Sequence, residues 1–170
     1  MIFPAMFLMI LALGPIVFIE AFALRSLNLS LERTVVSAAA ANFASTIIGI
    51  PLTWALLYAL QLATGFISLP PGTFADTLLG VTLRAPWAQV STPELEWTIY
   101  TAGMFLLIPF FFASWAVEYQ VVKKIAAREL IKVPDAAAKI KRAVRNANIY
   151  SYALLAAFIL VMMVIKLAKA

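Results

Sequence analysis

Residues 97–122 read WTIYTAGMFLLIPFFFASWAVEYQVV, an apolar segment in which Glu118 is the only charged residue. A helix needs about 20 apolar residues to cross the roughly 30 Å of hydrocarbon in a bilayer. In hydrocarbon the backbone groups must find partners inside the protein, and a helix supplies them within the segment itself. This segment therefore predicts a transmembrane helix, and the number of similar segments decides the fold.

Three further apolar segments occupy residues 3–24, 35–69 and 149–167. The chain is 64% hydrophobic and 12% charged, whereas soluble domains contain about 45–50% apolar residues. The segment 3–24 lacks the basic start and the short apolar run of a signal peptide, so we expect it to remain as a span. Residues 1–170 are therefore expected to form one all-α membrane domain, a four-helix bundle of two helical hairpins.

The second segment is longer than one bilayer and contains Gly49-Ile50-Pro51. Such a helix must tilt, bend at the proline or extend beyond the lipid. Pro70-Pro71-Gly72 ends it, and residues 70–96 form a connection that includes a short apolar piece at 78–83. That piece is too short to span, and it either lies in the interface or caps the bundle.

The third helical pattern continues beyond residue 122 through Leu130, and Val133-Pro134 then breaks it. Asp135 is expected to cap a helix that begins at Ala136 and runs directly into the fourth span. The third and fourth spans would then form a hairpin with a basic, water-exposed tip at residues 123–148.

Lysine and arginine are concentrated on one side of this topology. The connection between the second and third spans holds only Arg84. The connections after the first and third spans hold the remaining loop cations: Arg25, Arg33, Lys123, Lys124, Arg128, Lys132, Lys139, Lys141, Arg142 and Arg145. By the positive-inside rule, residues 123–148 are cytoplasmic, and residues 70–96 and both termini are extracytoplasmic. We therefore expect a multi-pass protein of the cell membrane.

Two carboxyl groups, Glu20 and Glu118, lie inside predicted spans, and the apolar core of the spans holds no lysine or arginine to pair with them. A charged side chain at the centre of a membrane costs about 2.5–3.5 kcal/mol on insertion scales. Each glutamate must therefore be protonated, reach a cation at the headgroups or bind something. If the two share a dry site without an ion, mutual repulsion and desolvation favour a proton on the pair near neutral pH.

The surroundings of the two glutamates suggest an internal repeat. Glu20 and Glu118 are each followed by a basic residue five positions later. The next helix then carries Ala-Asn-x-x-Ser, at residues 41–45 in one half and 147–151 in the other. A spacing of three places the asparagine and serine on one helix face. The residues that could converge on one site are Glu20, Asn42, Ser45, Glu118, Asn148 and Ser151.

These polar residues have two interpretations. As an ion site, the glutamates would bind a proton or a hard cation, with the asparagines as neutral oxygen ligands; the identity of such a metal stays open. As packing devices, the asparagines would hydrogen-bond to the glutamates between helices. Ala41, Ser45 and Gly49 recur at the spacing that lets membrane helices approach closely, as do Ala143, Ala147 and Ser151.

The basic tip also has more than one interpretation. Its positive charges satisfy the topology, and anionic lipid headgroups attract such residues at about 1 kcal/mol each. The residues expected to contact anionic lipid or a protein partner are Lys123, Lys124, Arg128, Lys139, Lys141, Arg142 and Arg145. We do not expect nucleic acid as a partner, because no aromatic residues interleave with this charge. A homo-oligomer or a larger membrane complex stays open.

The chain contains no histidine and no cysteine. This excludes histidine-ligated haem, metals held by histidine or cysteine, and Ser-His-Asp catalysis, and no cofactor is evident. The first functional hypothesis is a small transporter or channel component that binds a proton or cation. The alternative is a non-catalytic structural or assembly subunit of a membrane complex. An intramembrane enzyme would have to work with paired carboxyl groups, and we consider a non-enzyme the better reading.

Overall fold

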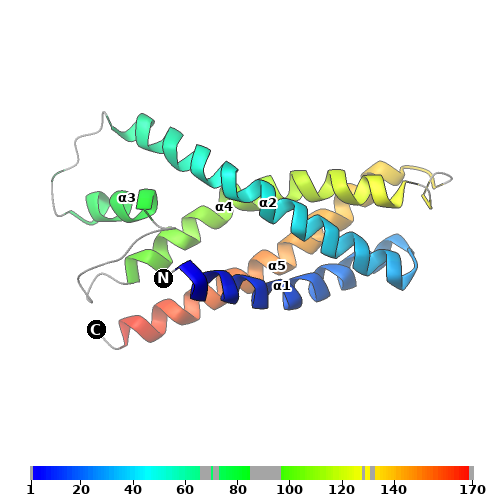
Figure 1. Ribbon diagram of the computed structural model, residues 1–170, viewed down its shortest axis with the longest axis horizontal. Coiled ribbons are helices and arrows are strands. Elements are labelled where there is room, and N and C mark those ends of the chain that lie inside the picture. The colour runs from blue at the N-terminus through cyan, green and yellow to red at the C-terminus, as the bar shows by residue number, and fades with distance from the viewer. Residues whose placement is uncertain are drawn as a thin grey trace. The chain divides into compact units, whose positions relative to one another are not determined.

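The computed structural model describes residues 2–65, 70, 73–84, 97–127, 129–130 and 133–168. Throughout these residues the regular structure is helical, and no strand occurs in them. The helices, in chain order, are α1 (Ile2–Leu24), the short 3-10 helix η1 (Arg25–Leu27), α2 (Leu31–Thr64), α3 (Phe74–Arg84), α4 (Trp97–Ala126) and α5 (Ala136–Leu167) (Figure 1). The chain is therefore all-α, as its sequence predicts.

Three of these helices are long and apolar enough to span a membrane, namely α2, the part of α4 from Ile99 to Ala126, and α5. The predicted span at 3–24 corresponds to α1, and its position in a membrane stays a prediction. Large apolar side chains such as those of Phe18, Phe43 and Phe112 are more than half exposed. Such exposure is unfavourable in water and natural against lipid tails.

Prolines lie inside three of the long helices, Pro15 in α1, Pro51 in α2 and Pro109 in α4. Each proline removes one backbone donor from the helix. All three helices continue through their prolines, as membrane helices can when neighbouring groups satisfy the freed carbonyls. Residues 35–64 of the long second segment accordingly lie in one helix, which ends at Thr64, before the predicted end at Pro70. Its two parts, on either side of Gly49-Ile50, belong to different units of the fold.

The sequence pattern overestimates the length of α4, which ends at Ala126 and does not continue through Leu130. The carbonyl of Ala126 accepts hydrogen bonds from the backbone N–H groups of both Glu129 and Leu130, at 3.1 and 3.0 Å. This sharing closes the helix in a turn. The predicted start at Ala136 is confirmed, and the backbone carbonyl of the preceding Asp135 accepts from the N–H of Lys139 at 3.0 Å.

The short apolar piece at residues 78–83 belongs to α3. Thr73 caps the start of this helix. Its hydroxyl oxygen accepts a hydrogen bond from the N–H of Asp76 at 3.3 Å, and its carbonyl accepts from the N–H of Thr77 at 3.0 Å. This is the usual way in which threonine caps a helix. Residues 85–96 of the predicted extracytoplasmic connection lie outside the described residues.

The chain forms two compact units. The first comprises Met1–Gly49 and Phe111–Ala153, and the second comprises Ile50–Phe110 and Leu154–Ala170. In the second unit Ala102 is fully buried, and a Cβ on Gly103 would lie 3.6 Å from the Cδ1 atom of Ile159. The small residues of α4 therefore allow α5 to approach closely here.

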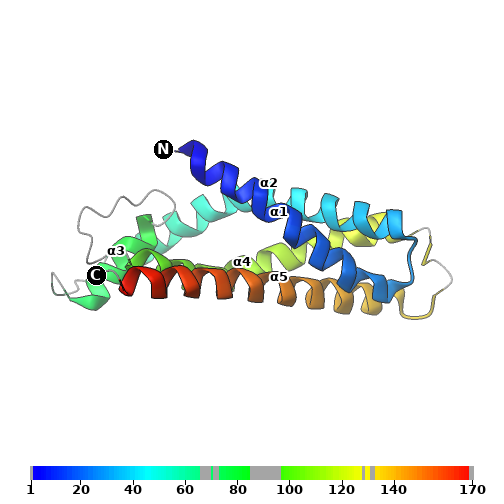
Figure 2. The same ribbon diagram turned by 90° about the horizontal axis from the view of Figure 1, so that it is seen from below.

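The first unit holds most of the buried residues. At its centre, small side chains of α2 and α5 are almost fully buried, with exposures of 0% and 1% for Ala38 and Ala41 and of 5% and 1% for Ala143 and Ala147. Ala41, Ala143 and Ala147 are among the small-residue positions that the sequence predicts for close helix packing, whereas Ala38 is not. The end of α1, the end of α4 and the start of α5 lie at the same end of this unit in both views (Figures 1 and 2).

Candidate functional site

Two glutamate side chains are buried in the first unit. Glu20 in α1 and Glu118 in α4 are each 2% exposed. Glu118 is moreover among the largest fully buried side chains of the described residues. Neither carboxyl group reaches the surface of the chain, so both need partners inside the protein.

Glu118 accepts hydrogen bonds on both of its carboxyl oxygens. Its Oε1 atom accepts from the hydroxyl groups of Ser45 in α2 and Ser114 in α4, each at 2.9 Å. Its Oε2 atom accepts from the Nδ2 atom of Asn148 in α5 at 2.5 Å. One carboxyl group thus joins three helices through donors that come from three different parts of the chain.

Glu20 has a related but smaller set of partners. Its Oε2 atom accepts from the Nδ2 atom of Asn42 in α2 at 2.5 Å. The side chain of Ser151 in α5 also interacts with this carboxyl group, and Glu118 is close enough to interact with it electrostatically. All six residues that the sequence predicts for the site therefore lie in one connected network.

The orientation of the two asparagine amides is fixed by the backbone. Besides its glutamate, each Nδ2 atom donates to a carbonyl one helical turn earlier, Asn42 to Ala38 at 2.9 Å and Asn148 to Val144 at 3.1 Å. Because a carbonyl can only accept, the nitrogen must face it. The asparagines therefore act as donors here, and the buried Oδ1 atom of Asn148 has no hydrogen-bond partner within the described part of the chain.

The contacts follow one scheme in both halves of the first unit. Each glutamate accepts from the asparagine of the next long helix along the chain. Ser45 then bonds to Glu118, whereas Ser151 interacts with Glu20. Each serine of the Ala-Asn-x-x-Ser pattern therefore meets the glutamate of the other half.

Two residues of this network escaped the sequence analysis, Ser114 and Tyr152. Tyr152 in α5 interacts with the Ser114 hydroxyl and electrostatically with Glu118 and Glu20. Its ring also packs edge-on against Phe111, with centroids 5.5 Å apart. Ser114 could have been found from its position one helical turn before Glu118. No comparable signal marks Tyr152, which adjoins Ser151 in sequence.

No lysine or arginine pairs with Glu20 or Glu118 among the residues that the structure describes. The groups around the two carboxyls are amides, hydroxyls and one phenol. These groups can donate hydrogen bonds to a carboxylate, and their oxygen atoms can accept a hydrogen bond from the O–H of a carboxylic acid. They supply no compensating positive charge.

The basic residues lie apart from this site on the surface of the first unit. Lys141 is placed over the Trp115 ring, 5.4 Å from its centre, and Lys123 over the Tyr119 ring, at 5.8 Å. The described members of the predicted basic set are all exposed: Lys123, Lys124, Lys139, Lys141, Arg142 and Arg145. Arg128 lies outside the described residues.

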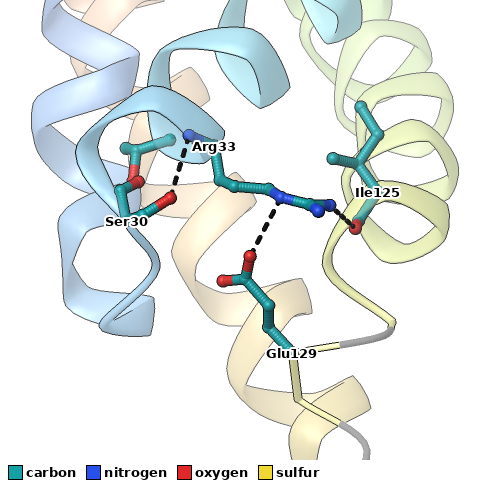
Figure 3. Close-up of polar contacts among 5 residues, drawn as sticks. Ser30, Arg33, Ile125 and Glu129 are labelled. Carbon is teal, nitrogen blue, oxygen red and sulfur yellow. Dashed lines mark hydrogen bonds and ion pairs between the residues drawn. The ribbon is translucent and has the colours of Figure 1, made fainter.

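One ion pair lies between the two turns of this unit (Figure 3). The Nε atom of Arg33 in α2 lies 2.9 Å from the Oε1 atom of Glu129, and its Nη1 atom donates to the carbonyl of Ile125 at 3.5 Å. Ser30 accepts from the N–H of Arg33 at 3.3 Å at the start of α2. This pair could not be predicted from the sequence, because surface charges have many alternative partners.

No protein-family model, no curated protein and no solved structure matches this chain.

Proposed function

We propose that the protein is a small integral membrane protein in which Glu20 and Glu118 together bind a proton or cation, as a component of a transporter or channel. The observation that carries this proposal is that two buried carboxyl groups of one hydrogen-bonded network interact electrostatically and have no lysine or arginine partner in the described residues. An ionisable residue inside a membrane segment is costly, which makes a function its most economical explanation.

The proposal includes a specific architecture. Helices α1, α2, α4 and α5 form a four-helix membrane bundle of two hairpins, α1 with α2 and α4 with α5. In this architecture the turns of both hairpins lie in the cytoplasm and both termini outside, which the basic residues at those turns support. The exposed lysines and arginines there contact anionic lipid headgroups.

The internal repeat belongs to the same proposal. The equivalent donors are Asn42 and Asn148, each bonded to its own glutamate and to its own backbone carbonyl. The hydroxyl oxygens of Ser45 and Ser151 also each lie within hydrogen-bond distance of the carbonyl of their asparagine, at 3.1 and 3.2 Å. Two related hairpins would thus supply two half-sites that meet at the carboxyl groups.

A proton fits the observed contacts better than a hard metal ion does. Metal ions such as Na⁺, Mg²⁺ and Ca²⁺ need several oxygen atoms directed at them. Here the amides of Asn42 and Asn148 direct nitrogen toward the carboxyls, and their backbone bonds hold them in that orientation. A cation would require both amides to turn over, whereas a proton requires no rearrangement.

Flux through liposomes tests the function. Purified protein is reconstituted with a pH indicator inside, and proton uptake is followed after an imposed pH gradient, with and without sodium, magnesium or calcium. We expect uptake by the wild type and its loss in Glu20→Gln and Glu118→Gln. Glu32→Gln, the same change at an exposed position at the start of α2, is the matched control and should behave as the wild type does.

A structural or assembly subunit is the second candidate. It is favoured by the way in which one carboxyl group, that of Glu118, joins α2, α4 and α5 through uncharged donors. A glutamine at position 118 could keep part of this network. Equal flux in the wild type, both glutamine variants and empty liposomes would therefore support this candidate and contradict the proposed transport.

A further inference from the structure

The two glutamates differ at the position one helical turn before each of them. Ser114 precedes Glu118 and donates its hydroxyl hydrogen to the Oε1 atom at 2.9 Å. Ile16 precedes Glu20 at the same spacing and has no group that can donate. The two halves of the network, otherwise alike in their asparagine and serine contacts, are therefore unequal at this one position.

This difference changes how well each carboxylate is stabilised. Glu118 accepts from Ser45, Ser114 and Asn148, whereas Glu20 has Asn42 and Ser151. Hydrogen bonds donated to a carboxyl group favour its ionised form over its neutral form. Of the two buried carboxyls, Glu118 is accordingly the better place for a negative charge.

The electrostatic interaction between Glu20 and Glu118 limits how many charges the two groups can carry. Two carboxylates that share a poorly solvated site repel each other, so that one of them keeps a proton. The other titratable group that faces them is Tyr152 of α5, and in the described parts of α1, α2, α4 and α5 no lysine or arginine contacts them. We therefore expect one carboxyl group of the pair to be ionised and the other to be protonated.

We propose that the site binds a single proton, that Glu20 carries it while Glu118 is ionised, and that Ser114 is the positioning residue that determines this asymmetry. The inference rests on the proposed function, because it specifies the ligand of the same carboxyl pair. A neutral Glu20 has one O–H to donate, and the neighbouring Ser151 hydroxyl can accept it.

Infrared spectroscopy of the full-length protein in lipid distinguishes a carboxylic acid from a carboxylate by its C=O stretch. At neutral pH we expect one acid band from the wild type. Glu20→Gln should abolish it, since the remaining Glu118 stays ionised among its donors. Glu118→Gln should retain it, because a buried Glu20 without a charged neighbour stays neutral.

Moving the hydroxyl tests the role of Ser114. In the double variant Ile16→Ser/Ser114→Ala, the extra donor is transferred to Glu20, and the acid band should now be abolished by Glu118→Gln and retained with Glu20→Gln. Ser114→Thr keeps the hydroxyl and should leave the wild-type assignment unchanged. Circular dichroism of each variant establishes that its helices are retained, so that a changed band reports on the proton.

An acid band that disappears with Glu118→Gln in the wild-type background contradicts the placement of the proton, while proton uptake by liposomes would still support the proposed function. An assignment that does not move in the double variant contradicts the role of Ser114. Absence of any acid band in the wild type at neutral pH overturns the single-proton inference, and the flux experiment then decides separately whether the site transports a cation.

Discussion

The hydroxyl group of Ser45 in α2 lies 2.9 Å from the Oε1 atom of Glu118 in α4. This bond joins helices from the two predicted hairpins, and Ser45 belongs to the half of the chain that carries the other glutamate. A hydrogen bond to a charged partner contributes about 1.5–3 kcal/mol. The contact therefore links the stability of the first unit to the state of the buried carboxyl pair.

Removal of this donor should destabilise the protein. Ser45→Ala is expected to lower the free energy of unfolding by about 1–3 kcal/mol, because a buried carboxyl oxygen loses a partner. The measurement is reversible unfolding in mixed detergent micelles. Thr46→Ala is the control, since the Thr46 hydroxyl donates to the backbone carbonyl of Asn42 at 2.8 Å and, within the described parts of the chain, to no carboxyl group. Equal losses in the two variants would contradict a special role for the bond to Glu118.

The stability of the folded protein should be sensitive to the size of the side chain at Ala38 in α2 but not at the neighbouring Ala39. Ala38 is fully buried and Ala39 is exposed. Ala38→Leu is expected to destabilise the folded state by about 1–3 kcal/mol through overpacking, as larger side chains do in well-packed cores. Ala39→Leu should change stability by much less in the same detergent titration. A neutral effect of Ala38→Leu would show that α2 does not pack through this face.

The ion pair between Arg33 and Glu129 should contribute little to stability. The two side chains are 43% and 35% exposed, and exposed pairs contribute about 0–1 kcal/mol. Arg33→Gln is therefore expected to lower the free energy of unfolding by less than about 1 kcal/mol, and by still less at high salt. Glu32→Gln is the control for loss of a nearby charge. A salt-independent loss of several kcal/mol would mean that the pair holds the two turns together.

The topology can be mapped with single cysteines, because the chain contains none. We expect a cysteine at Thr92 to react with an impermeant reagent in intact cells, and cysteines at Lys139 or Arg142 to react only after lysis. The reason is the concentration of basic residues on the cytoplasmic side. Labelling at position 139 in intact cells would reverse the proposed orientation.

Most of the helical structure could be predicted from the sequence, because a charge-free run of sufficient length has few alternatives to a helix in a membrane. The start of α5 at Ala136 follows from the Val133-Pro134 break, and the structure has it there. The end of α4 could not be predicted, since residues 127–130 continue the helical pattern. The helix ends where the carbonyl of Ala126 accepts hydrogen bonds from the N–H groups of both Glu129 and Leu130, which the sequence pattern does not indicate.

The members of the candidate site and the bonds from the asparagines to the glutamates could also be predicted, but the glutamate partners of the serines could not. Glu20 and Glu118 stand out because a carboxyl group is rare in an apolar span, and the asparagines stand out for the same reason. Which donor meets which oxygen depends on helix rotation and crossing, which polarity alone does not specify. Hydroxyl groups are common in membrane helices, so the position of Ser114 one helical turn before Glu118 marks it as a candidate, and the structure shows that it is a partner.

The central claim, that the two glutamates together bind a proton, is tested most directly by thermal unfolding at two pH values in detergent. If the folded pair holds a proton that the glutamates lose on unfolding at neutral pH, the folded state binds more protons, so stability falls as pH rises. We expect the wild type and Glu32→Gln to melt at a lower temperature at the higher pH, and Glu20→Gln to lose most of this dependence. Sodium, magnesium or calcium should restore stability at the higher pH only if a cation can replace the proton. Identical melting of the wild type and both glutamine variants, Glu20→Gln and Glu118→Gln, at both pH values and with every cation would contradict the account and leave the network as a packing device.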